Sequence, residues 1–173
     1  MEIWDLYDEN GALTGETMAR GEKWPEGKYH LVVHVCVFNQ KGEMLIQQRQ
    51  PFKQGWSNMW DITVGGSAVE GENGRQAAMR EVGEEIGLTI DLEGVRPHIR
   101  LSLTHCIDEI FLVEKEVDPA SLHLQYEEVQ RVEWASKEKI QSMIAQDVFI
   151  PYYASFIDLL FDMKGRYGCR SVD

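Results

Sequence analysis

Hydrophobic residues recur along the chain with two different periods, which predict strands around one central helix, followed by two terminal helices. Residues 31–38 form a Val-rich run typical of a buried strand, and the polar residues 39–42 predict a hairpin into a second strand over 43–49. An Asn-Gly turn signal follows a short strand over 3–7, and residues 19–29 and 50–58 have the composition of loops. Further strands are expected over 59–64, ending at Gly65-Gly66, within the alternating stretch 88–117, and over 129–134.

Helical spacing predicts a helix over 74–86, with two more over 136–144 and 152–163. Asn73 is suited to cap the first helix with Gln76 three residues on, and Gly87 stands where a left-handed C-cap belongs. Strands on both sides of one central helix predict an α/β fold, in which a mixed sheet is covered on both faces.

The composition is that of a globular protein rather than a disordered one. The chain has 173 residues, 43% hydrophobic and 27% charged, and no repeat or linker divides it. We therefore expect a single domain over 1–173, with an N-terminal extension of short strands over 1–28 and a C-terminal helix and tail over 151–173. Its net charge of −12 argues against binding of a nucleic-acid polymer. Small phosphorylated substrates remain compatible, because a divalent cation can invert the local charge.

The cysteines and the apolar runs indicate the cellular compartment of the protein. Cys36, Cys106 and Cys169 are widely spaced and odd in number, which fits neither a disulfide framework nor a zinc site. Cys36 and Cys106 are expected to be small hydrophobic residues in apolar strands. The N-terminus lacks the pattern of a signal peptide, and the apolar runs are too short to cross a bilayer. We expect a cytoplasmic protein that does not associate with membranes.

The helix predicted over 74–86 carries an unusual acidic arc. Glu81, Glu84 and Glu85 lie at i, i+3 and i+4, beside an apolar arc of Ala78, Met79, Val82 and Ile86. Like charges at this spacing repel by a few tenths of a kcal/mol per pair, and Gly83 costs about 1 kcal/mol more in a helix interior. A solvated acidic face is the ordinary explanation of such a pattern. A hard divalent cation is the alternative, since Mg²⁺ and Mn²⁺ prefer carboxylate ligands.

The residues before this helix favour the second explanation. Gly65-Gly66 follows a predicted strand, and two glycines allow the backbone to approach a ligand closely. Glu70 and Glu72 lie in the loop that leads into the helix. From Gly66 to Leu88 the chain resembles the Nudix box, GX5EX7REUXEEXGU with U aliphatic, at every fixed position. The fixed positions are Gly66, Glu72, Arg80, Glu81, Val82, Glu84, Glu85, Gly87 and Leu88.

This resemblance implies a Nudix hydrolase with an α/β/α sandwich and a loop–helix–loop motif. Such an enzyme uses Mg²⁺ or Mn²⁺ to cleave a diphosphate linked to some group X. By that likeness the metal would be held by Glu81, Glu84, Glu85 and the Gly65 carbonyl. Arg80 would orient the acidic cluster and Glu72 would brace the loop, with Gly66 and Gly87 as structural positions of the motif.

Other residues are candidates for binding the substrate or moving a proton. A carboxylate must take the proton of the attacking water, and either Glu85 or Glu128, in a later loop, is the candidate. Arg49 and Lys53 could hold phosphate oxygens, although surface solvation is the ordinary role of such residues. Trp56, in a polar loop, could stack on a nucleobase, whereas Trp60 is expected in the core.

A second resemblance concerns isopentenyl-diphosphate isomerases of the same superfamily. It rests on segments 4–11, 29–31, 45–49 and 56–60, on His30, and on Glu109. Where the isomerase has a Cys-Gly-His run, this chain has Val64-Gly65-Gly66, so the catalytic thiol and one histidine ligand are missing. Without those metal partners, His30 and its strand neighbour His34 are expected to be satisfied by other groups.

The sequence therefore predicts metal-dependent hydrolysis of a small nucleoside diphosphate or another X-linked diphosphate. Isomerase-like activity and a non-catalytic Nudix-fold binding or regulatory module are the alternatives. Pyrimidine nucleoside diphosphates, nucleotide sugars, CoA esters and isoprenoid diphosphates all remain open as substrates. The apolar stripe Phe156, Leu159, Leu160 and Met163 is expected in the core, with a homodimer contact as the second choice.

Overall fold

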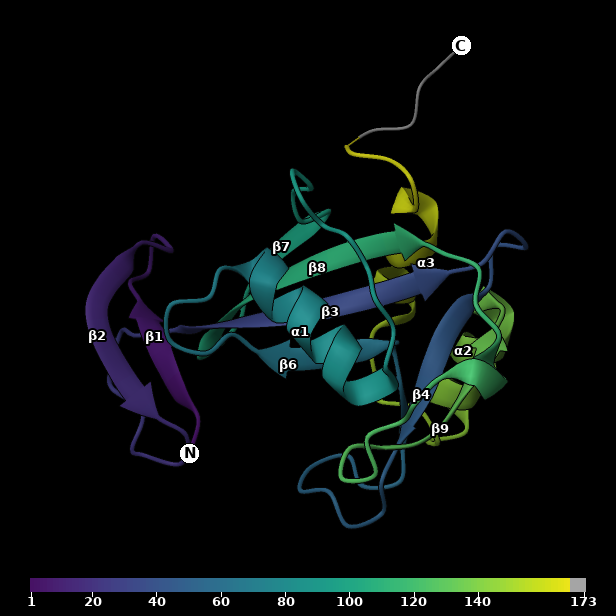
Figure 1. Ribbon diagram of the computed structural model, residues 1–173, viewed down its shortest axis with the longest axis horizontal. Coiled ribbons are helices and arrows are strands. Elements are labelled where there is room, and N and C mark those ends of the chain that lie inside the picture. The colour runs from purple at the N-terminus through teal and green to yellow at the C-terminus, as the bar shows by residue number, and fades with distance from the viewer. Residues whose placement is uncertain (169–173) are drawn as a thin grey trace.

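The computed structural model describes residues 1–168, and a mixed sheet of seven strands lies at the centre of this part of the chain (Figure 1). The order of the strands is β5-β4-β3-β8-β7, with β6 also paired to β3 and β9 to β4. The strands are β3 (His30–Phe38), β4 (Met44–Arg49), β5 (Trp60–Asp61), β6 (Val64–Ser67), β7 (Ile99–Ser102), β8 (Cys106–Glu114) and β9 (Val129–Ala135).

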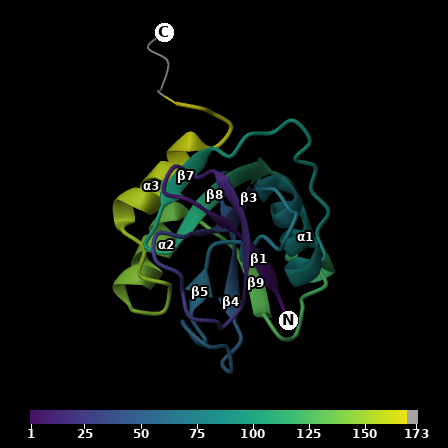
Figure 2. The same ribbon diagram turned by 90° about the vertical axis from the view of Figure 1, so that its left-hand side faces the viewer.

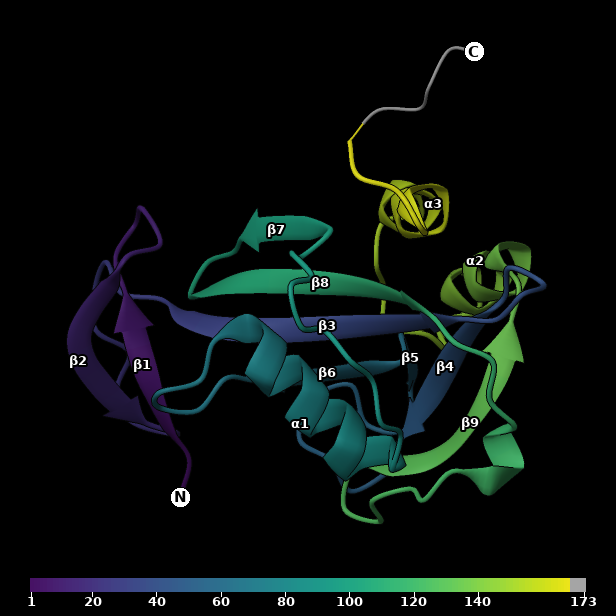
Figure 3. The same ribbon diagram turned by 45° about the horizontal axis from the view of Figure 1, so that its top comes forward.

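Strand β3 organises both layers of the core. It pairs in parallel with β8, and helix α1 (Gly74–Ile86) lies between the two in sequence. Val33, Val35 and Val37 belong to the same core cluster as the apolar side chains of α1. Cys36 and Phe38 instead pack in a second cluster with α2 (Lys137–Ala145) and α3 (Ala154–Met163). Alternate side chains of one strand thus serve opposite faces, which produces the predicted α/β/α sandwich (Figure 3).

Helix α1 begins and ends where its sequence predicts. The Asn73 side chain accepts a hydrogen bond from the Gln76 N–H (3.1 Å), and the Gln76 side chain accepts one from the Asn73 N–H (3.0 Å). Gly87 has a φ of +66° and closes the helix in the left-handed conformation. Val82 and Ile86 are fully buried as expected, whereas Met79 is only partly buried. The two caps therefore fix the first and last residues of the helix that carries the acidic arc.

The single strand expected over 59–64 is wrong, because the chain changes partners within it. β5 pairs with β4 and β6 pairs with β3, so Gly65 and Gly66 lie inside a strand rather than after one. At the crossing, the Thr63 hydroxyl accepts a hydrogen bond from the Val37 N–H (2.9 Å) and donates to the Leu45 carbonyl. A side chain thus replaces the backbone ladder at this point.

The alternating stretch expected as strand over 88–117 is strand only in β7 and β8. Leu88, Ile90 and Leu92 alternate and are buried in the core with α1, yet residues 88–98 do not form a strand. Burial alone explains the alternation there, since every second side chain covers the core while the backbone runs as a loop.

The N-terminal region forms a hairpin of its own, which faces the viewer in Figure 2. The bounds of its first strand, β1 (Ile3–Tyr7), were predicted, whereas none were predicted for β2 (Leu13–Ala19), of which only Met18 is buried. The ring of Trp4 stacks on His30 of β3 at 4.4 Å between centroids. This contact, together with the Tyr7–Tyr29 bridge, attaches the hairpin to the end of β3.

The two terminal helices cover the face of the sheet opposite α1. Ile140, Ile157 and Leu160 are fully buried, and Trp60 is in the core as expected. The predicted apolar stripe is only partly right, because Leu159 is exposed and Ile157 takes its place in the core. None of the helices within residues 1–168 is both long and apolar enough to traverse a bilayer. Cys36 is buried and Cys106 half-buried, whereas Cys169 lies outside the described residues.

Candidate active site

A polar cavity of about 310 Å³ lies beside the acidic arc of α1. It is bounded by β3, β6 and two loops that follow β4 and precede β9. Charged and polar groups make up most of its wall. The lining residues are Glu2, Arg20, Val32, His34, Arg49, Lys53, Gly65, Gly66, Ser67, Arg80, Glu81, Glu84, Glu85, Gln125 and Glu128.

Arg80 connects three carboxylates at one edge of this cavity. Its Nη1 lies 2.9 Å from Glu81 Oε1 and 3.0 Å from Glu84 Oε2. Its Nε and Nη2 donate to the two oxygens of Glu72 at 2.8 and 2.9 Å. Nη2 also donates to the Ser67 carbonyl (3.0 Å), which joins the helix to the end of β6. The arginine therefore holds both the acidic arc and the loop before the helix.

Glu72 fixes the loop from its other side. Its Oε2 accepts a hydrogen bond from the Val69 N–H at 3.0 Å. Burial acts to raise the pKa of Glu72, but the hydrogen bonds from Arg80 and Val69 outweigh it and leave the pKa lowered. The ionised form of Glu72 is thus the form that this loop stabilises.

The acids of the arc differ strongly in environment. Glu85 is only 5% exposed, whereas Glu84 is exposed to solvent. Burial raises the pKa of Glu85 to about 8, and the charges of Glu81, Glu128 and Asp61 act in the same direction. The opposing influence is a hydrogen bond that Gln47 Nε2 donates to Glu85 Oε2 at 3.0 Å. Burial also raises the pKa of Glu81, against the attraction of Arg80.

The two glycines of β6 are required by the close approach of neighbouring side chains. A Cβ at Gly66 would lie 2.2 Å from the carboxylate carbon of Glu81. A Cβ at Gly65 would lie 2.6 Å from the ring of His34. Glycine therefore lets the carboxylate of Glu81 lie directly against the backbone of β6.

The basic candidates Arg49 and Lys53 both line the cavity. Lys53 forms an ion pair with Glu128, and the Glu128 carbonyl accepts a hydrogen bond from the Gln50 N–H at 3.0 Å. The Nε of Arg49 is buried without a hydrogen-bond partner among the described residues. Because Arg49 itself lines the cavity, its guanidinium is a group by which an anionic oxygen would be stabilised.

Trp56 does not line this cavity. It is 52% exposed in the loop between β4 and β5 and has a φ of +49°. Of the other predicted site residues, all line the cavity except Glu72 and Gly87. These two lie outside the wall and support the ends of the loop–helix–loop.

Several residues of the wall were not anticipated as site residues. His34 Nδ1 lies 2.9 Å from both oxygens of the buried Asp108, and the ring borders the cavity. A charged residue inside the apolar run of β8 was the available signal for Asp108. Glu2 and Arg20 reach the cavity from the N-terminal hairpin and are paired with each other at 3.0 Å. No local pattern could have indicated them, because only the docking of the hairpin brings them there. His30 is satisfied as expected, by the His105 carbonyl and Ser67.

The donor chemistry of the arc fits a hard divalent cation. Within residues 1–168 no three His, Cys, Asp or Glu side chains already converge as a complete metal site. Burial nevertheless raises the pKa of both Glu81 and Glu85, because it disfavours the charged form of each carboxylate. Among the described residues Glu85 also has no ion-pair partner, since Arg80 contacts Glu81 and Glu84 instead. Positive charge supplied at this point would relieve that penalty.

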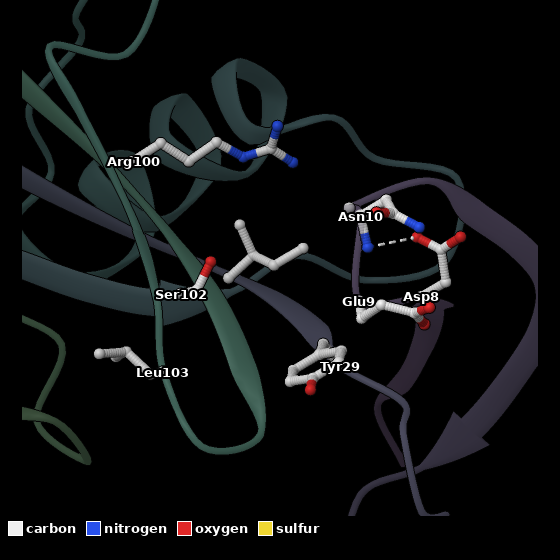
Figure 4. A pocket seen from close by; sticks show the side chains of 9 residues that line it. Asp8, Glu9, Asn10, Tyr29, Arg100, Ser102 and Leu103 are labelled. Carbon is white, nitrogen blue, oxygen red and sulfur yellow. Dashed lines mark hydrogen bonds between the residues drawn. The ribbon is translucent and has the colours of Figure 1, made fainter.

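A second cavity, of about 250 Å³, lies between the N-terminal hairpin and the β7–β8 ribbon (Figure 4). Arg100 extends toward it from β7, and Tyr29 and Ser102 border it. Its acid Asp8 is already used by the hairpin turn, because Oδ1 accepts hydrogen bonds from the N–H groups of Asn10 and Ala12 at 2.9 Å. Asp8 and Glu9 are the two acids among its lining residues, so this cavity lacks the larger acidic cluster of the first one.

Comparison with known proteins relates the chain to one family. The model of the NUDIX domain matches residues 28–156. An uncharacterized Nudix hydrolase of Listeria innocua is 48% identical over 164 residues, which cover 95% of this chain and 96% of that protein. An isopentenyl-diphosphate Delta-isomerase of Streptomyces coelicolor is 29% identical, covering 90% of this chain and 82% of the relative.

A solved structure supports the fold. The crystal structure of a Deinococcus radiodurans protein superposes with a TM-score of 0.70 at 20% identity, over 92% of this chain and 97% of that one. At this identity the likeness concerns the arrangement of sheet and helices.

Proposed function

Because this chain belongs to the Nudix family of hydrolases, we propose that it hydrolyses a diphosphate bond with the help of Mg²⁺ or Mn²⁺. The substrate is a small nucleoside diphosphate or another X-linked diphosphate. One observation carries the proposal: the buried carboxylate of Glu85 and that of Glu81 share a cavity with Arg49 and Lys53. The cavity thus combines carboxylates that a metal ion would stabilise with basic side chains that would bind phosphate oxygens.

The metal would be held by Glu81, Glu84, Glu85 and the Gly65 carbonyl. When bound, it supplies positive charge to the diphosphate and makes water a better nucleophile at neutral pH. Arg80 keeps Glu81 and Glu84 in place, so the carboxylates are oriented before substrate arrives.

The remaining residues of the wall bind the substrate and move the proton. Arg49 lines the cavity and would offer its guanidinium to a phosphate oxygen. Lys53, at present paired with Glu128, can exchange that carboxylate for a phosphate. Glu85 or Glu128 accepts the proton of the attacking water: both carboxylates line the cavity, and release from Lys53 would free Glu128.

The absence of a suitably placed thiol favours hydrolysis over isomerisation. Val64 is fully buried, and neither Cys36 nor Cys106 lines this cavity within the described residues. Valine cannot transfer a proton to an alkene. The buried thiol of Cys36 belongs to the core under α2 and α3.

The test is a panel of diphosphates incubated with the full chain, with Mg²⁺, with Mn²⁺ and with a chelator. The panel contains nucleoside diphosphates, nucleotide sugars, a CoA ester and isopentenyl diphosphate, scored both for phosphate products and for alkene isomerisation. Metal-dependent release of phosphate products is the expected result. Isomerisation without hydrolysis would establish the isomerase alternative, and binding without any turnover would establish a regulatory module.

Two further expectations accompany this proposal. The free thiols of Cys36 and Cys106 support a reducing, cytoplasmic location. The exposed Leu159 on α3 is the position at which a homodimer contact would form, and sedimentation of a Leu159→Glu variant would test it.

A further inference from the structure

Two large aromatic side chains are exposed in the two loops that also supply lining residues of the active-site cavity. Phe52 is 56% exposed and Tyr126 is 71% exposed, although each belongs to a residue type that usually buries much of its ring. Their ring centroids lie 5.7 Å apart with an interplanar angle of 42°. The two rings come from different loops, one after β4 and one before β9, so their pairing is a product of the fold.

Hydrogen bonds link the loop that carries Phe52 to the loop that carries Tyr126. The Gln50 N–H donates to the Glu128 carbonyl (3.0 Å), and the Gln50 side chain donates to the Val129 carbonyl (3.3 Å). The ion pair of Lys53 with Glu128 adds a third link. The aromatic pair is therefore carried by a connected frame rather than by two independent loops.

Phe52 and Tyr126 are each adjacent in sequence to a residue that lines the cavity. Phe52 precedes Lys53, and Tyr126 follows Gln125, and both of these neighbours lie in the wall. The Gln125 N–H also donates to the Glu85 carbonyl at 2.8 Å. The backbone that carries Tyr126 is thus bonded directly to the catalytic end of α1.

The cavity and the aromatic pair suit different parts of one molecule. Val32 is the one purely aliphatic side chain among the lining residues, so the cavity suits the charged diphosphate and not an aliphatic chain. Two adjacent ring faces outside it suit a flat aromatic group, which stacks on such faces whatever its hydrogen-bonding pattern. Trp56 is also exposed, but it has no aromatic neighbour among the contacts of residues 1–168.

We propose that Phe52 and Tyr126 form the subsite that stacks on the base of a nucleoside diphosphate substrate. This inference rests on the proposed function, and it narrows the group X to one that carries a planar ring. It also replaces Trp56 as the stacking residue. Isoprenoid diphosphates, which lack such a ring, would gain nothing from the pair.

The experiment measures binding separately from turnover. Calorimetry in Mg²⁺ compares two non-hydrolysable probes, α,β-methylene-ADP and methylenediphosphonate, which share the bridged diphosphate and differ in the nucleoside. The proteins are the wild type, Phe52→Ala, Tyr126→Ala, the double variant, and Tyr153→Ala as a control that removes an exposed tyrosine elsewhere. Circular dichroism and size-exclusion chromatography establish that each variant is folded and has the same oligomeric state.

The double variant is expected to bind α,β-methylene-ADP about 10- to 100-fold more weakly than the wild type, with each single variant in between. Its affinity for methylenediphosphonate, and both affinities of the control, should change less than about twofold. Equal weakening of both probes, unchanged affinity for α,β-methylene-ADP, or a changed oligomeric state would overturn the subsite.

Hydrolysis assays separate this inference from the function on which it rests. If α,β-methylene-ADP binds through Phe52 and Tyr126 while no diphosphate in the panel is cleaved, the catalytic proposal fails and the subsite stands. If nucleoside and isoprenoid diphosphates are cleaved with kcat/KM values that the double variant leaves unchanged, the catalytic proposal stands and the subsite fails. If the wild type does not bind α,β-methylene-ADP, the subsite is overturned, and the hydrolysis panel alone decides the catalytic proposal.

Discussion

Arg80 binds Glu72 through two parallel hydrogen bonds, from Nε and Nη2 to the two carboxylate oxygens, at 2.8 and 2.9 Å. The pair spans eight residues of sequence and closes the loop between β6 and α1. Because the same guanidinium contacts Glu81 and Glu84, the geometry of the loop and of the acidic arc are coupled. Bidentate pairing of this kind is directional as well as strong, so lysine would not replace Arg80.

Acid should remove the contribution of Glu72 to stability. Its pKa is lowered in the folded protein, so this contribution is present above the pKa of the unfolded chain and disappears as the pH falls through the folded value. Glu72→Gln should lower the free energy of unfolding by about 1 kcal/mol at neutral pH. Urea denaturation across acidic and neutral pH checks this. The difference between variant and wild type should vanish in acid, and exposed Glu70→Gln should show no such difference.

Removing the buried carboxylate of the arc should abolish most activity. Glu85→Gln keeps the shape of the side chain and its place beside Gln47. It removes the negative charge that would hold the metal ion at the diphosphate. We expect kcat to fall by about 10²- to 10³-fold. Steady-state kinetics on the best substrate of the panel measures it, with exposed Glu93→Gln as the control. Near wild-type turnover of the Glu85 variant would show that the assigned role is wrong.

A methyl group at Gly66 should damage catalysis more than folding. The added Cβ would lie 2.2 Å from the carboxylate carbon of Glu81, and this carboxylate can swing away because it ends a flexible side chain. We expect Gly66→Ala to lower kcat about 10-fold or more while the free energy of unfolding changes by less than about 1 kcal/mol.

Gly83 provides the matched control for that variant. It lies on the exposed side of α1, and its Cβ would contact nothing within 4 Å. Gly83→Ala should retain activity and raise the free energy of unfolding by about 1 kcal/mol, since glycine is unfavourable in a helix interior. Thermal or urea denaturation combined with kinetics distinguishes the two substitutions. Equal activity of both would contradict the close approach of Glu81 to β6.

Arg49 should contribute to substrate affinity through its guanidinium and not through charge alone. A guanidinium can donate parallel hydrogen bonds to phosphate oxygens, so Arg49→Lys retains the charge on the cavity wall and removes that donor. We expect KM to rise about 10-fold with a smaller change in kcat. Exposed Arg96→Lys should leave both constants unchanged. An unaltered KM in the Arg49 variant would mean that the diphosphate binds elsewhere in the cavity.

The local sequence determined the helix and its acidic arc. Asn73, Gln76 and Gly87 cap α1 through contacts within a few residues, so its bounds and the side on which Glu81 and Glu85 lie follow from spacing alone. The same holds for β3 and its hairpin, where β-branched composition and a polar turn are sufficient. The approximate bounds of α2 and α3 were likewise predictable.

Helical spacing places Glu85, and not Glu84, beside the apolar arc of Ala78 and Val82. Only the tertiary structure decided what faces this buried acid, namely Gln47 of β4 and the loop of Glu128. Arg20, His34 and the Phe52–Tyr126 pair join the site through contacts between segments far apart in the chain. Long-range packing, unlike capping, leaves no periodic trace in the residues that take part. The strand break at Thr63 has the same cause, since it depends on two partners, Val37 and Leu45, from different strands.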